Sequence, residues 1–371
     1  MKGKMIFFVH LLNDYSGSPK VLKDILENDV FDNSSVVLFT TDTDGFLSGL
    51  NFKYVYIPYR KFNNKYMKLI AFLFSQLYLF LSVSFYFVKF RVLNFEISLV
   101  VNTLLPFGAG ILGRFFKSSL YYVHETYIRP RTLYLFLKKV AYFSKSNAIY
   151  VSKYVSMYGG INSNDEIVIY NGLGSNYLCD KKLVFDSLEY KFKNKVLLFV
   201  SSLVQYKGVE QFIKLSICMP SFQCKLVLNA SECEFLDWIN VNGIIVPPNV
   251  IVYYRPNNLS EIYLSSMFIL NLTDPIFCIE TFGLTLIEGM SQGCIPIAPP
   301  HGGPAEIINS DFGLLVEPTE IEHIKSYILD VSGDYRCWCD LSIRSFKRSL
   351  FFSKDRFDCE ISEYFSSRGF V

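Results

Sequence analysis

The stretch "MFILNLTDPIFCIETFGLTLIEGMSQGCIPIAP", residues 267–299, decides the fold. Two short apolar runs, "MFILNLT" (267–273) and "CIPIAP" (294–299), flank a segment in which "TFGLTL" changes from a loop to a helix near Gly283. A strand, a loop, a helix and a second strand in this order form the repeating unit of a parallel sheet with helices on its faces. The stretch therefore predicts an α/β protein.

The same alternation extends over almost the whole chain. In the first half, strands are expected at 5–10, 35–40, 53–58, 96–102, 119–124, 147–152 and 166–171. After a polar, weakly patterned stretch near 174–193, the alternation restarts with strands at 195–201, 224–230, 249–254, 267–273 and 294–299. A chain of 371 residues has room for two cores, since single cores stop growing at roughly 250–300 residues. We expect Rossmann-like domains at 1–174 and 190–350, with a boundary near 175–190 and a final helical segment at 351–371.

The charge, the cysteines and the first apolar run limit the classes of protein to which this chain can belong. A formal net charge of +2 gives no reason to expect a nucleic-acid partner. The nine cysteines show no pair of C-x-x-C units that would suggest structural zinc, and we expect buried reduced thiols in preference to disulfides. The first apolar run, Met5 to Leu12, is short and contains His10, so we interpret it as a buried strand and not as a signal peptide. These features predict a cytoplasmic protein.

Two carboxylates suggest a ligand site in the fold-deciding stretch. Glu280 and Glu288 are eight residues apart, on either side of the helix start at Gly283. Unpaired backbone N–H groups and the positive end of a helix dipole suit a phosphate, and flanking carboxylates can accept hydrogen bonds from sugar hydroxyls. A nucleotide-sugar fits this pattern. Alternatively, Glu288 is a solvated helix residue and Glu280 only caps the helix.

The order E-x-F-G-L-x-x-x-E-G-M-x-x-G-x-x-P-I-A, followed by G-G-x-x-E-I-I, resembles the retaining GT-B glycosyltransferases of the family 4 type. This resemblance implies two Rossmann-like domains whose parallel sheets face each other across a cleft, with a nucleotide-diphosphate sugar bound by the second domain. It also implies that Glu280 and Glu288 form the family's E-x7-E motif. The donor site would then comprise Thr281, Phe282, Gly283 and Leu284 as well.

The resemblance continues into "LLFVSSLVQYKGVEQFI", residues 197–213. It implies that Lys207 contacts the donor diphosphate, while the family's usual arginine is replaced by Ser202. Lys207 and helix-terminal N–H groups would then neutralise most of the leaving phosphate, with Ser202 as a further donor-binding residue. Alternatively, Lys207 is an ordinary surface lysine.

The first half matches the family more loosely. Ser16-Gly17-Ser18 stands where the family has a glycine-containing loop, which implies donor binding by Gly17 and acceptor binding by Ser16 and Ser18. His124 ends a strand, where many members have a histidine near the transferred sugar, and Glu125 beside it is an acceptor candidate. Alternatively, His124 is structural and the small residues form only a turn. His124, Lys207 and Glu280 are the expected catalytic residues.

The resemblance implies retaining transfer of a hexose-type sugar to a hydroxyl of a glycan. We expect no metal and no other cofactor, since no D-x-D-like cluster stands out and Lys207 with backbone N–H groups would stabilise the diphosphate. In the family's mechanism the departing phosphate itself helps to deprotonate the acceptor. A lipid-linked intermediate of a bacterial polysaccharide is the expected acceptor. A nucleotide-sugar epimerase or a glycan phosphorylase of the same architecture remains an alternative, as does a non-enzymatic membrane-associated scaffold.

The twenty residues from Leu69 to Val88 contain no charge and are long enough to cross a bilayer. Their position between two expected strands predicts a crossover helix of the first domain instead. Lys68, Ser75, Ser82 and Lys89 form a thin polar stripe, and Lys61, Lys65 and Arg91 add positive charge at the ends. One side of the helix would remain apolar in water. Residues 65–91 are therefore predicted to contact an anionic membrane surface at the inner face of the cytoplasmic membrane; a buried or dimer-forming helix and a true span remain alternatives.

Overall fold

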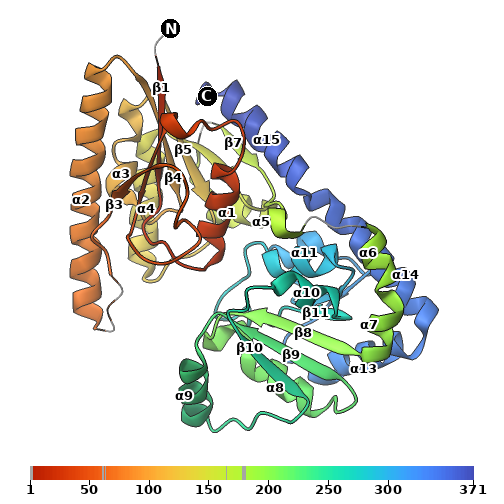
Figure 1. The fold of residues 1–371 in the computed structure, drawn as a ribbon. Helices are drawn as coiled ribbons and strands as arrows, with labels where there is room; N and C mark the ends of the chain where they lie inside the picture. Colours follow the sequence, from red (N-terminus) through yellow and green to blue (C-terminus); the bar gives the residue numbers. More distant parts are fainter. Residues whose placement is uncertain (1–2, 61, 63, 164, 178–180) are drawn as a thin grey trace. The chain divides into compact units, whose positions relative to one another are not determined.

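A computed structural model describes residues 3–60, 62, 64–163, 165–177 and 181–371. Lys61 and part of the expected boundary segment, 178–180, lie outside the described residues. The chain divides into two compact units, Met1–Gly172 with Phe357–Val371 and Leu173–Arg356. They are called the first and second domain below, and each is built on one sheet (Figure 1).

The first domain contains a parallel sheet in the order β3-β2-β1-β4-β5-β6-β7. Its strands are β1 (Lys4–Val9), β2 (Val36–Thr40), β3 (Lys53–Tyr56), β4 (Glu96–Asn102), β5 (Ser118–Val123), β6 (Asn147–Tyr150) and β7 (Glu166–Val168). Each of the seven strands overlaps one of the seven predicted from the sequence, and β3, β6 and β7 end two or three residues earlier than predicted. Because every strand is parallel, all their carboxyl ends lie on one edge, where loop residues can converge on a ligand.

Helices cover this sheet. They are α1 (Gly17–Leu26), α2 (Lys65–Val92), α3 (Phe107–Gly110), α4 (Arg131–Ser144), α5 (Lys153–Gly159) and the greater part of α15 (Lys354–Ser367). The last helix belongs here because it contributes to the core: the Phe365 ring lies 5.0 Å from Phe31 and 6.3 Å from Phe8. The expected first strand is buried, with Met5 to Val9 at most 4% exposed.

The second domain has a parallel sheet in the order β10-β9-β8-β11-β12-β13. Its strands are β8 (Val196–Ser201), β9 (Gln223–Leu228), β10 (Val250–Tyr254), β11 (Phe268–Leu270), β12 (Ile295–Ala298) and β13 (Leu314–Leu315). Its helices are α6 (Lys181–Asp186), α7 (Leu188–Asn194), α8 (Val209–Ile217), α9 (Glu232–Asn242), α10 (Leu259–Leu264), α11 (Leu284–Ser291), α12 (Pro304–Ile307), α13 (Ile321–Gly333) and α14 (Tyr335–Ser349). Only β13 escaped prediction, because two residues carry no pattern.

Helix α2 connects β3 to β4 along the outside of the first sheet, as predicted for a crossover (Figure 1). The strands that precede α2 and those that follow it belong to the same sheet, since β1 pairs directly with β4. In the part of the chain that the structure describes, α2 alone is long and apolar enough to cross a membrane. Because α2 runs beside the sheet, a span would force the sheet itself into the hydrocarbon, which argues against one.

The inner face of α2 is unexpectedly polar at its centre. Ser75 is fully buried and donates to the Phe72 carbonyl at 2.6 Å, while the Gln76 side-chain oxygen accepts the Gly108 N–H at 3.0 Å. The outer face is apolar and exposed, with exposed fractions between 52% and 63% for Leu69, Ile70, Leu73, Phe74, Leu77, Leu81, Phe85 and Val88. The centre of the polar stripe therefore faces the rest of the first domain, and the apolar side of α2 faces outward.

The eight described cysteines are free thiols. Cys224 and Cys294 are buried, as expected, whereas Cys233, Cys337 and Cys359 are exposed.

Candidate functional site

An ion pair lies at the carboxyl edge of the second sheet. Lys207 Nζ donates to Glu280 Oε2 at 2.7 Å, although the two residues are 73 positions apart in the sequence. Lys207 ends a short 3₁₀ turn, Gln205–Lys207, that follows β8, and Gly208 behind it has φ +91°. A Cβ on Gly208 would lie 2.2 Å from the Leu272 carbonyl oxygen, so only glycine fits between this turn and the segment after β11.

Both members of the pair are held in their charged forms. Burial alone would raise the pKa of Glu280, but the charge of Lys207 and hydrogen bonds from Lys207, Asn271 and Thr273 outweigh it and hold that pKa below its ordinary value. Burial alone would lower the pKa of Lys207, and Glu280 reverses that shift, so its pKa is raised. The site therefore contains a partly exposed ammonium group whose position is fixed by a carboxylate.

The loop after Glu280 leads directly into α11. Gly283 precedes the helix with φ +108°, and Phe282 is buried against Phe352. The Gly302-Gly303 turn packs on this loop, because a Cβ on Gly302 would lie 2.2 Å from the Glu280 carbonyl oxygen and the Gly303 N–H donates to that same oxygen at 2.9 Å. The two glycines permit this close approach of the backbones. They hold the loop so that Glu280 and the start of α11 stay adjacent.

The other predicted donor residues occupy different positions around this loop. Thr281 and Leu284 are partly exposed beside Gly283. Glu288 lies inside α11, as its spacing predicted, but it is 3% exposed and accepts a hydrogen bond from the Tyr263 hydroxyl at 2.8 Å. Contact between Glu288 and a ligand would require the carboxylate to leave this partner or to share it.

Ser202 borders a hollow of about 540 Å³ at the ends of β8 and β9. Asn229, Trp238 and Asn242 also line it, together with Leu203, Val204, Ala230, Glu234, Asp237 and Val241. An indole and amide side chains at the ends of parallel strands can stack on and hydrogen-bond to a planar ring.

A second polar cluster lies at the carboxyl edge of the first sheet, with Asn102 at its centre. His124 Nε2 lies 2.8 Å from Asn102 Oδ1, and Asn102 Nδ2 lies 3.0 Å from His10 Nδ1 and donates to the Ser18 carbonyl at 3.1 Å. In the tautomers that satisfy both contacts, His124 donates from Nε2 and keeps a free Nδ1 lone pair. One amide thus orients His124 and connects it to the predicted acceptor segment.

Glu125 lies beside this cluster. Its carboxylate accepts weakly from the backbone N–H groups of His124 and Leu104 at 3.3 and 3.4 Å, and burial raises its pKa to about 7. Ser16 precedes α1, and its hydroxyl is bonded to Asp14. Gly17 and Ser18 were predicted in the loop but are already the first residues of α1, because the helix begins one residue after Ser16.

The pKa values of this cluster predict opposing effects on stability. Burial lowers the pKa of His10 to about 4 and that of His124 to about 3, so the unfolded chain takes up protons below about pH 6.5 that the folded domain excludes. Stability is therefore lost as the pH falls, by about 2 kcal/mol per histidine between pH 7 and 5. The raised pKa of Glu125 has the opposite effect, because the folded domain takes up a proton on this carboxylate before the unfolded chain does. It increases the stability of the fold by about 2 kcal/mol as the pH falls from 7 to 5.

Hydrogen exchange of β5 amides at pH 7 and pH 5 separates these contributions. His124→Gln should flatten the acid loss of protection and Glu125→Gln should steepen it. His323→Gln, on an exposed ring, is the matched control. Identical pH dependence in all four proteins would contradict the protonation states described above.

Among the described residues, no three His, Cys, Asp or Glu side chains are grouped to hold a metal. His301 pairs instead with Glu317 at 2.7 Å.

Sequence reasoning overlooked the residues that orient the site, namely Asn102, Asn271, Thr273 and Tyr263. Asn102 ends β4, and Asn271 and Thr273 follow β11, so a polar residue at the carboxyl end of an apolar strand was the available signal.

The two parallel-sheet Rossmann-like domains, with seven and six strands, define a GT-B fold. Within the second domain, residues 243–336, which include Glu280 and Glu288, match the family model described as "Glycosyl transferases group 1". The predicted GT-B fold with two Rossmann-like domains is thereby confirmed.

Individual proteins show the same similarity. The crystal structure of Anabaena HepE in complex with UDP and glucose superimposes with a TM-score of 0.74 at 16% identity, covering 98% of this chain and 100% of that one. WaaG, a glycosyltransferase involved in lipopolysaccharide biosynthesis, gives a TM-score of 0.67 at 13% identity, covering 97% and 99%. A probable sucrose-phosphate synthase of Beta vulgaris is 32% identical over 114 residues, which are 29% of this chain and 10% of that protein. The chain thus spans only about a tenth of the length of this curated relative.

Proposed function

We propose that the protein is a retaining glycosyltransferase that transfers a hexose-type sugar from a nucleotide-diphosphate donor to a hydroxyl of a glycan. The observation that carries this proposal is the Lys207–Glu280 pair beside the start of α11. Glu280 and α11 lie inside the segment 243–336 that matches the group 1 glycosyltransferase model. HepE, with the same fold, binds UDP and glucose, which supports a nucleotide-sugar donor.

The chemistry assigned to this site needs no metal or other cofactor. The bond between the sugar C1 and the β-phosphate oxygen breaks, and the acceptor oxygen bonds to C1 on the same face. The departing phosphate accepts the hydroxyl proton. Lys207 and the free N–H groups at the start of α11 neutralise the charge that develops on the diphosphate. Glu280 holds Lys207 in place and can also accept a hydrogen bond from a hydroxyl of the donor sugar. The base of the nucleotide occupies the hollow beside Ser202 and Trp238.

The first domain is assigned to the acceptor. In this proposal the Nδ1 of His124 accepts a hydrogen bond from a sugar hydroxyl, and Glu125 and the Ser16–Ser18 segment bind the acceptor. Asn102 connects these elements by the contacts described above.

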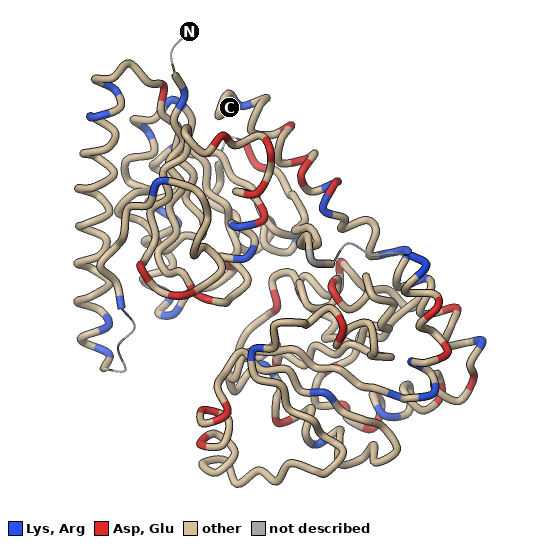
Figure 2. Tube along the Cα trace, in the orientation of Figure 1, with Lys and Arg blue, Asp and Glu red and all other residues tan. Residues whose placement is uncertain are grey.

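The acceptor is proposed to be a lipid-linked intermediate of a bacterial polysaccharide, bound at the inner face of the cytoplasmic membrane. Helix α2 has lysine and arginine residues only at its two ends, and together with its apolar outer side this arrangement suits an anionic lipid surface (Figure 2). WaaG, which has the same fold, is a glycosyltransferase involved in lipopolysaccharide biosynthesis, and this supports a role in the assembly of a bacterial surface polysaccharide.

A panel of nucleotide-diphosphate sugars with glycan and lipid-linked acceptors tests the reaction. NMR should show a product with the anomeric configuration of the donor, and Glu280→Gln should lower the transfer rate about tenfold or more by loosening Lys207. An inverted product would overturn retention. An epimer or a sugar phosphate formed without transfer would instead identify an epimerase or a phosphorylase.

A further inference from the structure

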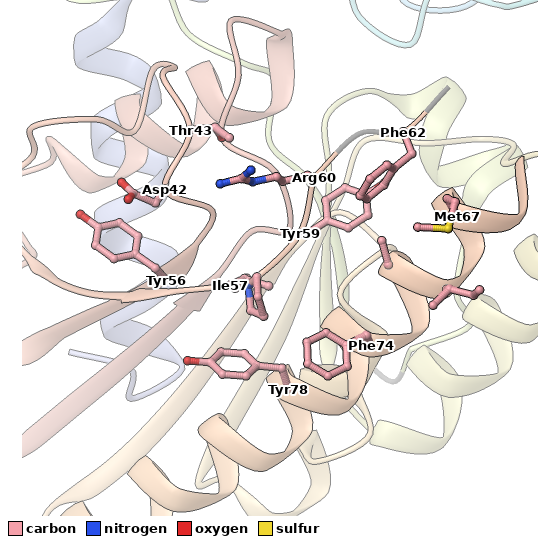
Figure 3. Close-up of a pocket in the computed structure, with 13 residues that line it drawn as sticks. Asp42, Thr43, Tyr56, Ile57, Tyr59, Arg60, Phe62, Met67, Phe74 and Tyr78 are labelled. Atoms are coloured by element: carbon pink, nitrogen blue, oxygen red, sulfur yellow. The ribbon is translucent and has the colours of Figure 1, made fainter. Parts of the chain in front are cut away.

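A groove of about 590 Å³ lies between α2 and the segments that follow β2 and β3 (Figure 3). Most of its wall is aromatic or aliphatic, formed by Tyr56, Ile57, Pro58, Tyr59, Phe62, Met67, Ile70, Ala71, Phe74 and Tyr78. The polar lining residues, Asp42, Thr43 and Arg60, gather toward one end. The groove is thus apolar along most of its length and has a cation near one end.

We propose that this groove binds the apolar chain of a prenyl phosphate or diphosphate, with the phosphate beside Arg60. The inference rests on the proposed function, because it identifies how a lipid-linked acceptor is held. It adds a lipid site that is separate from the cluster around His124.

The groove is continuous with the exposed side of α2. Ile70 and Phe74 belong to both surfaces and are 61% and 57% exposed. A chain leaving a bilayer against α2 can therefore enter the groove without crossing a polar barrier. Each methylene group buried there is worth about 0.8 kcal/mol.

Charge complementarity selects the head group. Arg60 is exposed at the polar end of the groove and is the cation among its lining residues. A planar guanidinium can bind a phosphate through two parallel hydrogen bonds. Asp42 would repel a phosphate directly beside it, so we place the phosphate on the Arg60 side and a sugar hydroxyl next to Asp42.

The position of the groove also limits the length of the acceptor. It opens at the carboxyl end of β3, which is four strand spacings, about 19 Å, from β5 and His124. A sugar attached directly to the phosphate would not cover that distance. The acceptor that fits both sites already has several sugar units between its phosphate and the reacting hydroxyl, so earlier transferases must supply it.

Farnesyl diphosphate is a suitable soluble probe, with inorganic diphosphate and farnesol as controls for head group and chain. Calorimetry on the full chain should show farnesyl diphosphate binding at least about tenfold more tightly than either control, since both halves contribute. Ala71→Trp, which fills the groove, should abolish this preference. Arg60→Ala should weaken binding of farnesyl diphosphate about tenfold but leave farnesol unchanged.

Phe85→Asp is the matched control, because Phe85 is exposed on α2 but does not line the groove. It should retain farnesyl diphosphate binding. Equal binding of all three probes, or unchanged binding in both groove variants, would overturn the proposal. So would a dimer that Ala71→Trp dissociates without any probe binding, since a second copy would then be the occupant.

Nucleotide-sugar binding, measured on the same samples, distinguishes the two proposals. Donor binding without prenyl binding would reject the groove alone, whereas prenyl binding without any donor binding or transfer would reject the transferase assignment.

Discussion

Replacing Lys207 with alanine should reduce the transfer rate by about 10²- to 10³-fold, the loss typical for removing one preorganised group that stabilises developing negative charge. The expected cause is electrostatic. The variant removes the ammonium group and leaves the Glu280 carboxylate unpaired next to the departing diphosphate, so an attraction is replaced by a repulsion. Initial rates at saturating donor, together with donor affinity, are the required measurements.

The structure supplies controls for this experiment. Lys207→Arg keeps the charge and should recover part of the rate. Lys214→Ala removes an exposed lysine of the same domain that pairs with Glu210 at 2.7 Å, and it should have no effect. The double variant of Lys207 and Glu280 to alanine should be less than additive, because the two side chains act as a unit. A Lys207→Ala enzyme at full rate would remove Lys207 from the mechanism.

Most of the architecture followed from local sequence patterns. Runs of six or seven mostly apolar residues, separated by helical segments, were sufficient to place twelve strands, because strands buried on both faces are nearly uniformly apolar. The two-residue β13 gave no such signal. Spacing also placed Gly283 at the start of α11 and Glu288 inside it.

The contacts of the site were less predictable because they join residues that are distant in the chain. The sequence around Lys207 does not indicate that its partner is Glu280. Asn102 contacts several residues of the cluster only because β1, β4 and β5 are neighbours in the sheet. The environment of Glu288 was also hidden, since its partner Tyr263 comes from α10.

The orientation of helix α2 could not be predicted from the periodicity of its polar residues. A stripe of lysine and serine suggested which residues share a side, but periodicity could not say which side faces the domain. The structure turns Ser75 and Gln76 inward, where local and cross-helix hydrogen bonds satisfy them, and leaves leucine and phenylalanine outside. The side of α2 that stays apolar in water is therefore the side of these exposed leucine and phenylalanine residues.

The exposed apolar side of α2 leads to the second prediction with a large expected effect, which concerns binding to membranes. The double variant Leu77→Asp/Leu81→Asp should reduce partitioning onto vesicles containing anionic lipid by at least about 10²-fold, because each leucine buried in the interface contributes about 1.5–3 kcal/mol. Both side chains are more than half exposed, at 56% and 57%, and lie one turn apart on the outer face of α2. The fold should be unaffected, since neither leucine is buried. Sedimentation with vesicles of neutral and anionic composition provides the measurement.

Three comparisons make this result specific to a membrane-binding face. Leu329→Asp, on an exposed leucine of α13 in the second domain, should sediment like the unmodified protein. High salt should weaken binding of the unmodified protein to anionic vesicles, because the basic ends of α2 act through screened charge. Transfer to a soluble glycan should persist in the double variant while transfer to a vesicle-bound acceptor falls. If the unmodified protein ignores vesicles and the double variant instead converts a dimer to a monomer, the apolar face of α2 is a subunit interface, because a second copy would then bury the same leucines.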